Sequence, residues 1–168
     1  MDPKKYNLEN LRVLIVDDSK YMLQLIASIL RSIGVGVLFE TSEVEIALGE
    51  ISIFQPDIII TEWRMKPISG LQFVKEIRGG NHGADQYVPI IVLTSDMERS
   101  LVIESRDVGV NEFLIKPISA NILYARIGSI LNKKREFVES KAYFGPDRRR
   151  KVKGSQNLRR KADRLDEN

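Results

Sequence analysis

Apolar residues along the chain fall into two alternating kinds of segment. The first kind is a short run rich in β-branched residues, which predicts a strand buried on both faces. Such runs lie at residues 11–16, 35–39, 57–62, 88–94 and 113–115. The second kind is longer, has apolar residues three or four positions apart, and predicts an amphipathic helix. Segments of this kind lie between Ser19 and Gly34 and at residues 44–51, 69–78, 97–108 and 119–131.

Local signals mark the ends of the first two predicted helices. Short polar side chains at residues 17–19 suit the cap of the first helix, and Gly34 stands just beyond its end. Ser42 followed by Glu45 predicts a capping box for the second helix. The apolar face of the first helix is expected to consist of Met22, Leu25, Ile26, Ile29 and Leu30.

Five strands alternating with five helices predict an α/β fold. Crossovers of this length join parallel strands through right-handed connections, so we expect a doubly wound five-stranded parallel sheet with helices on both faces. The ligand site of such a fold lies at the carboxyl ends of the strands, where the winding reverses. The polar residues at those ends are Asp17, Asp18, Glu62, Thr94 and Lys116.

Each of these residues also has a purely structural interpretation. An aspartate at residues 17–18 can be only a helix cap, Thr94 only a strand residue, and Lys116 only a solvated side chain in a turn. Glu62 fits such an interpretation least, because a carboxylate at the end of a buried strand needs partners. Their joint occurrence at strand ends favours one shared site.

This set of residues, in this order, resembles the response-regulator receiver (CheY-like) family over residues 10 to about 131. The family has an acidic pair after strand one, a phosphoacceptor aspartate after strand three, a Thr or Ser after strand four and Lys-Pro after strand five. Here those positions hold Asp17-Asp18, Glu62, Thr94 and Lys116-Pro117. The resemblance implies a flavodoxin-like receiver fold, with glutamate replacing the phosphoacceptor aspartate.

The resemblance also implies roles for the site residues. Mg²⁺ would be held by Asp17, Asp18, Glu62 and the carbonyl of Arg64, in keeping with its preference for oxygen ligands. Lys116 would pair with the phosphate and the Thr94 hydroxyl would move to bind it. Phe113 would then change rotamer and reshape the surface formed by helix four, strand five and helix five.

Glu62 departs from that scheme. Its extra methylene carries the carboxylate about 1.5 Å further into the site, roughly one bond length. We therefore expect Glu62 to lie within ion-pair reach of Lys116, to bias Phe113 inward and to imitate a phosphorylated aspartate. The cation of Arg64 competes with Mg²⁺ for the same space, and Pro67 falls one place later than the family's usual proline.

Charge divides the chain into two parts. Residues 1–132 carry 13 basic and 17 acidic residues, a net charge of −4, whereas residues 133–168 carry 13 basic and 6 acidic residues, a net charge of +7. We expect a receiver domain at 10–132 and a basic, largely disordered C-terminal extension at 133–168. The extension is too short and too polar for a DNA-binding output domain.

Two interpretations of the extension remain open. In the first, aromatic residues pack on the receiver and a solvated charge run follows. In the second, Arg148, Arg149 and Arg150 bind a phosphate-bearing ligand such as a cyclic dinucleotide or nucleic acid, because guanidinium grips phosphate bidentately. The pattern around Phe137 and residues 143–150 resembles the extension of certain single-domain receivers from alphaproteobacteria.

These features together favour a cytoplasmic signalling adaptor over an enzyme. No nucleophile–base pair or cofactor loop is visible, the chain has no cysteine, and no apolar stretch is long enough for membrane insertion. The expected partner is a kinase, a flagellar protein or another signalling protein. The alternatives are a sensor of a phosphate-bearing ligand and a receiver that is still phosphorylated on Glu62.

Overall fold

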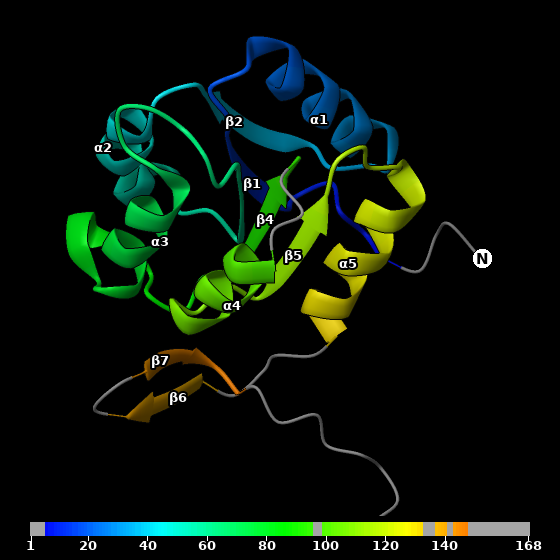
Figure 1. The fold of residues 1–168 in the computed structure, drawn as a ribbon. Coiled ribbons are helices and arrows are strands. Elements are labelled where there is room, and N and C mark those ends of the chain that lie inside the picture. Colours follow the sequence, from blue (N-terminus) through cyan, green and yellow to red (C-terminus); the bar gives the residue numbers. More distant parts are fainter. Residues whose placement is uncertain (1–5, 96–98, 133–136, 141–142, 148–168) are drawn as a thin grey trace, which may run out of the picture.

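The computed structural model describes residues 6–95, 99–132, 137–140 and 143–147. Strands and helices alternate from the first strand to the last long helix, and a hairpin follows (Figure 1). The strands are β1 (Arg12–Val16), β2 (Val37–Thr41), β3 (Ile58–Thr61), β4 (Ile90–Thr94), β5 (Glu112–Ile115), β6 (Phe137–Ser140) and β7 (Tyr143–Pro146). The helices are α1 (Lys20–Ser32), α2 (Val44–Phe54), α3 (Gly70–Arg78), the short 3-10 helix η1 (Asn81–Gly83), α4 (Arg99–Asp107) and α5 (Ala120–Asn132).

The first five strands form one parallel sheet in the order β2-β1-β3-β4-β5, which confirms the predicted fold class. Successive strand side chains point to opposite faces, so each face has its own apolar cluster. Ile59 packs on the face covered by α2, α3 and α4, whereas Ile58 and Ile60 pack on the face covered by α1 and α5 (Figure 1).

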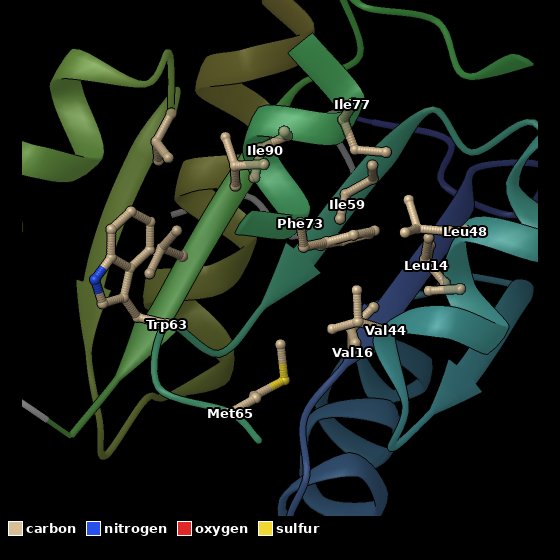
Figure 2. Close-up of a cluster of buried hydrophobic side chains, with 14 of the residues drawn as sticks. Leu14, Val16, Val44, Leu48, Ile59, Trp63, Met65, Phe73, Ile77 and Ile90 are labelled. Carbon is tan, nitrogen blue, oxygen red and sulfur yellow. The ribbon is translucent and has the colours of Figure 1, made fainter. Parts of the chain in front are cut away.

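The first cluster reaches the loop that follows β3. Phe73 of α3 lies at the centre of this cluster, close to Leu14 of β1 and Ile59 of β3 (Figure 2). Trp63 and Met65 join the same cluster and are buried. The loop that carries the candidate site is therefore fastened to the core on both sides of Arg64.

Two predictions about the helices were wrong. The predicted capping box at Ser42 is absent, because Glu43 is the N-cap of α2 and the Thr41 hydroxyl accepts its backbone N–H at 3.1 Å. A capping box stands instead at Ser69 and Gln72, at the start of α3. Leu25 of α1 is exposed and Leu23 is buried in its place. Spacings of three and four allow both, so the pattern alone did not decide between them.

The second strand begins two residues later than predicted. Val35 is buried but its N–H donates to the Leu30 carbonyl at 3.0 Å, so it still belongs to the turn that ends α1. Gly36 then lies against the backbone of Glu9 without room for a β-carbon. The strand therefore starts at Val37, beyond this close contact.

The hairpin of β6 and β7 was not predicted as such, although an aromatic anchor was. Phe137 and Phe144 pack on Tyr87 with ring centroids 5.1 and 5.4 Å away, and Arg78 lies over the Phe137 ring. The interpretation in which aromatic residues pack on the receiver is thus confirmed for these two. Residues 148–168, including Arg148, Arg149 and Arg150, lie outside the described residues.

Candidate functional site

Backbone pairing at the carboxyl ends of the strands brings the predicted site residues together. Asp17 follows β1, Glu62 follows β3, Thr94 ends β4 and Lys116 follows β5. The Glu62 N–H donates to the Val16 carbonyl at 2.9 Å, and the Lys116 N–H donates to the Thr94 carbonyl at 2.8 Å. The pocket at this edge is lined by Asp17, Asp18, Ser19, Met22, Glu62, Arg64, Thr94, Ser95 and Lys116.

The Lys116 ammonium lies between two buried carboxylates. Its Nζ is 2.7 Å from Glu62 Oε2 and 2.7 Å from Asp17 Oδ2. The exposed fractions of the three side chains are 12% for Lys116, 8% for Glu62 and 2% for Asp17. The predicted contact between Glu62 and Lys116 is therefore confirmed, and Asp17 is its third member.

The remaining oxygen of each carboxylate accepts from backbone N–H groups. Asp17 Oδ1 accepts from Ser19 at 2.9 Å. Glu62 Oε1 accepts from Trp63 at 2.5 Å and from Arg64 at 3.2 Å, so the side chain folds back over the peptides that follow it. Every oxygen of the two carboxylates thus has a donor, as buried polar groups require.

The electrostatic balance at Lys116 favours its charged form. Burial by itself lowers the pKa of the Lys116 ammonium, but the hydrogen bonds and negative charges of Asp17 and Glu62 outweigh burial and raise that pKa above its usual value. Lys116 therefore remains a cation at neutral pH.

The loop between Glu62 and α3 is held close to the site by a glycine. The Gly70 N–H donates to the Trp63 carbonyl at 2.9 Å. A β-carbon at Gly70 would collide with the carbonyl oxygen of Glu62 and with the backbone of Trp63. Only glycine lets the first turn of α3 approach this closely, and the approach fixes the backbone from which the Glu62 side chain projects.

The other predicted residues occupy different environments. Asp18 lines the same pocket but is exposed, so the two aspartates of the acidic pair are not equivalent. Thr94 is buried. Phe113 is half-buried and packs against the cluster under α2, α3 and α4, and its expected inward bias stays a prediction. Its rotamer change, and the movement of the Thr94 hydroxyl, stay predictions.

The donor set does not form a ready Mg²⁺ site in this arrangement. Asp17 and Glu62 are turned toward the ammonium of Lys116, and no group of three His, Cys, Asp or Glu side chains within the described residues is placed to hold a metal ion. The assignment of Asp17, Asp18 and Glu62 as metal ligands stays a prediction.

Comparison with known proteins decides the family. The family model for the response regulator receiver domain matches residues 13–128. The chain belongs to the response regulator receiver family. Receivers act in two-component and chemotaxis signalling, typically bind Mg²⁺, and catalyse their own phosphorylation without being enzymes in the usual sense.

Several chemotaxis proteins are similar to this receiver. Chemotaxis protein CheY-3 of Vibrio cholerae is 27% identical over 125 residues, which cover 74% of this chain and 95% of that protein. Chemotaxis protein CheY of Pseudomonas aeruginosa is 27% identical over 123 residues, covering 73% and 98%. Each match thus covers about three quarters of this chain and nearly all of the relative.

Solved structures show the same fold. Chemotaxis protein CheY4 of Vibrio cholerae superposes with a TM-score of 0.65 at 26% identity, covering 71% of this chain and 98% of that one. A two-component response regulator from Clostridium difficile superposes with a TM-score of 0.67 at 26% identity, covering 76% and 100%. None of the described helices of this receiver is long and apolar enough to cross a membrane.

Some residues of the pocket were not indicated by the sequence pattern. Ser95, Ser19 and Met22 line it, and the N–H of Trp63 contacts Glu62. Ser19 and Ser95 follow strand ends closely, which is the one signal that points to them. The backbone donors of Glu62 have no such signal, because any residue type supplies an N–H group.

Proposed function

We propose that this receiver is a cytoplasmic signalling adaptor in which Glu62 imitates a phosphorylated aspartate. One observation carries the proposal: Glu62 Oε2 lies 2.7 Å from the Nζ of Lys116. In the family this lysine pairs with the phosphate. Here the longer acidic side chain at the phosphoacceptor position reaches the lysine itself, so the contact needs no phosphoryl group.

The geometry around Glu62 opposes ordinary phosphorylation. Each of its carboxylate oxygens already accepts at least one hydrogen bond, and the side chain is longer than that of aspartate by one carbon–carbon bond of about 1.5 Å. An error of this size in the position of a reacting group can cost about a hundredfold in rate. The arrangement therefore favours a permanent contact between Glu62 and Lys116 over phosphorylation of Glu62.

The proposed state does not depend on Mg²⁺. The Lys116 ammonium pairs with both Asp17 and Glu62 and offsets one of their two negative charges, and the Arg64 backbone N–H donates to Glu62 Oε1 at 3.2 Å. If Mg²⁺ binds, Asp17, Asp18 and Glu62 are the residues that would hold it. The ion would neutralise the negative charge of phosphoryl oxygens.

The output surface that we propose is the face formed by α4, β5 and α5. Ile103 of α4, Ile115 of β5 and Ile122 of α5 are exposed, one on each element. Exposed apolar side chains on neighbouring elements favour this face as a protein-binding surface. A kinase, a flagellar protein or another signalling protein is the class of partner that this face suits.

Phosphate incorporation from acetyl phosphate tests the proposal. The wild-type protein is expected to take up no stable label with or without Mg²⁺, whereas Glu62→Asp is expected to take up label with Mg²⁺. Glu62→Gln is the matched control, because it keeps the side-chain length and removes the acceptor. Stoichiometric Mg²⁺-dependent labelling of the wild type that disappears in Glu62→Gln would show that Glu62 is still phosphorylated.

A second candidate function rests on the basic extension. Its net charge of +7, with three consecutive arginines at 148–150, suits a phosphate-bearing ligand such as a cyclic dinucleotide or nucleic acid. These arginines lie outside the described residues, so their role stays a prediction. In this alternative the receiver fold serves as the scaffold for the sensor.

A further inference from the structure

Helix α2 has an apolar stripe on the side that faces away from the core. Its core side consists of Val44, Ala47, Leu48 and Ile51. Ile46 and Ile53 lie on the opposite side and are 44% and 76% exposed. They are seven residues apart, which is about two helical turns, so they lie on one line along the helix. Gly49 lies between them.

Gly49 leaves the helix backbone uncovered at the middle of this stripe. No heavy atom lies within 4 Å of the place where its β-carbon would be. Glycine in the interior of a helix destabilises it by about 0.5–1 kcal/mol relative to alanine. Neither the packing of α2 nor a positive φ requires glycine here, whereas the close approach of another backbone would.

Acidic residues flank the stripe. Glu43, Glu45 and Glu50 lie on the N-cap and the helix, and residues 43–54 contain no lysine or arginine. None of the three glutamates forms an ion pair with any residue in the described part of the chain. The α2 stripe is defined as Ile46, Gly49 and Ile53 with these three glutamates. It is thus apolar along its centre with acidic residues beside it, and the Arg12 guanidinium lies at its C-terminal end, where it contacts Phe54.

We propose that the α2 stripe is a docking surface for an amphipathic basic helix of a partner protein. Such a helix would place apolar residues, spaced three, four and seven positions apart, against Ile46 and Ile53. Gly49 would let the two helix axes come close together, and lysines or arginines on its flanks would face the glutamates. The charge of the stripe therefore selects a basic helix over an acidic one.

The α2 stripe is distinct from the proposed output face. Helix α2 packs over β1 and β2, and β2 is at one edge of the sheet while β5 is at the other. Helices α2 and α5 accordingly lie on opposite sides of the molecule (Figure 1). One protein can therefore bind at α2 while another binds at α4, β5 and α5. An adaptor would then have two separate binding surfaces. The α2 proposal does not depend on the state of Glu62.

A designed peptide tests this surface on the full-length protein. The probe is a fluorescent helical peptide of about 18 residues with leucines at the three, four and seven spacing and lysines on both flanks. A second peptide has the same composition in scrambled order, so it keeps the charge and loses the apolar stripe. A third has glutamates in place of the lysines. Fluorescence anisotropy gives the dissociation constants.

The probe is expected to bind at least about tenfold more tightly than the scrambled and acidic peptides. Ile53→Ser is expected to weaken binding of the probe about tenfold, and Glu45→Gln with Glu50→Gln to weaken it severalfold at low salt and less at high salt. Ile103→Ser and Ile122→Ser are the matched controls on the output face and are expected to leave the affinity unchanged. Circular dichroism checks that each variant is folded.

Three outcomes overturn the proposal. The first is equal binding of the probe and its scrambled form, which reduces the effect to non-specific charge. The second is loss of binding in Ile122→Ser but not in Ile53→Ser, which moves the site to the output face. The third is a probe that binds only after residues 148–168 are deleted, which identifies the chain's own extension as the occupant.

Discussion

Asp17 and Glu62 share one cation, and this sharing determines how each of the three residues contributes to stability. The Lys116 ammonium hydrogen-bonds both carboxylates at 2.7 Å in a site that is largely closed to water. Burying charges has a cost that their attraction offsets only while the set is complete. The loss of stability on removing one residue therefore depends on which two charged residues remain.

Lys116→Met is expected to destabilise the fold by about 3 kcal/mol, because it leaves two buried carboxylates facing each other. Glu62→Gln is expected to cost less, since Lys116 keeps Asp17. The double variant Glu62→Gln with Lys116→Met is expected to be more stable than Lys116→Met alone, because one of the uncompensated charges is gone. Urea denaturation measures all three, and additive losses in the double variant would speak against a coupled site.

The raised pKa of Lys116 predicts a pH dependence. The folded state holds this proton more tightly than the unfolded chain, so the stabilisation is fully present below the ordinary lysine pKa of 10.5 and is lost as pH rises through the raised value. The difference in unfolding free energy between wild type and Lys116→Met should be flat from neutral pH to about pH 9 and shrink above the ordinary value. A difference that shrinks already at neutral pH would contradict it.

Residue types alone indicated the members of the site but not their geometry. Glu62, Lys116, Thr94 and the acidic pair stand at strand ends, which the alternating pattern located. The pattern could not separate the buried Asp17 from the exposed Asp18, because the difference comes from the turn in which Ser19 donates its N–H to Asp17. It also could not show that Glu62 folds back over the N–H groups of Trp63 and Arg64.

At the scale of elements, a single buried arginine joins segments that are distant in sequence. Arg78, at the end of α3, donates to the carbonyls of Gly109, Gln86 and Val88 and to the side chain of Asn111, at 2.8 to 3.0 Å. Its guanidinium also lies over the Phe137 ring of β6. Burial lowers the pKa of Arg78 to about 10, yet the group remains charged at neutral pH.

Arg78→Met is expected to destabilise the fold by about 3 kcal/mol or more, because it leaves several buried acceptors without a donor. Arg78→Lys is expected to recover only a small part of the loss, since one ammonium cannot reach acceptors arranged around a planar guanidinium. Urea denaturation measures the loss, and hydrogen exchange at residues 137–146 follows the hairpin. Full rescue by lysine would show that only the charge matters.

Helices and strands were predictable where the spacing of apolar residues determines their position. They were less predictable where tertiary contacts determine their bounds. The alternation of apolar runs located all five strands of the sheet and the helices between them. The start of β2 and the cap of α2 depended on contacts of Gly36 and Thr41 that leave no local signal. The hairpin of β6 and β7 packs against Tyr87, about fifty residues earlier in the chain, so the sequence indicated its aromatic residues but not its strands.

At the scale of the whole molecule, an acidic receiver carries a basic extension. A segment with a net charge of +7 attracts polyanions in general, so charge alone does not define a ligand site. A site for a defined phosphate-bearing ligand and a non-specific charge run therefore differ in what the arginines of the extension do. Lysine in their place would keep the attraction and lose the bidentate geometry.

Deleting residues 145–168 is expected to abolish binding to a cyclic dinucleotide or nucleic acid while the receiver stays folded, and binding by the intact protein should weaken steeply with salt. Replacing Arg148, Arg149 and Arg150 together by lysine separates the alternatives. Loss of binding, measured by titration calorimetry, would support a guanidinium site for a defined ligand. Unchanged affinity would reduce the extension to non-specific electrostatics and leave the adaptor function alone.

The central claim is that Glu62 holds the receiver in the state that phosphorylation produces in other receivers. Backbone amide NMR of the α4, β5 and α5 face tests it most directly, with spectra of the wild type and of Glu62→Asp before and after Mg²⁺ and acetyl phosphate. The wild-type spectrum is expected to stay unchanged on this addition and to match Glu62→Asp after phosphorylation. A wild-type spectrum that matches unphosphorylated Glu62→Asp would contradict the claim.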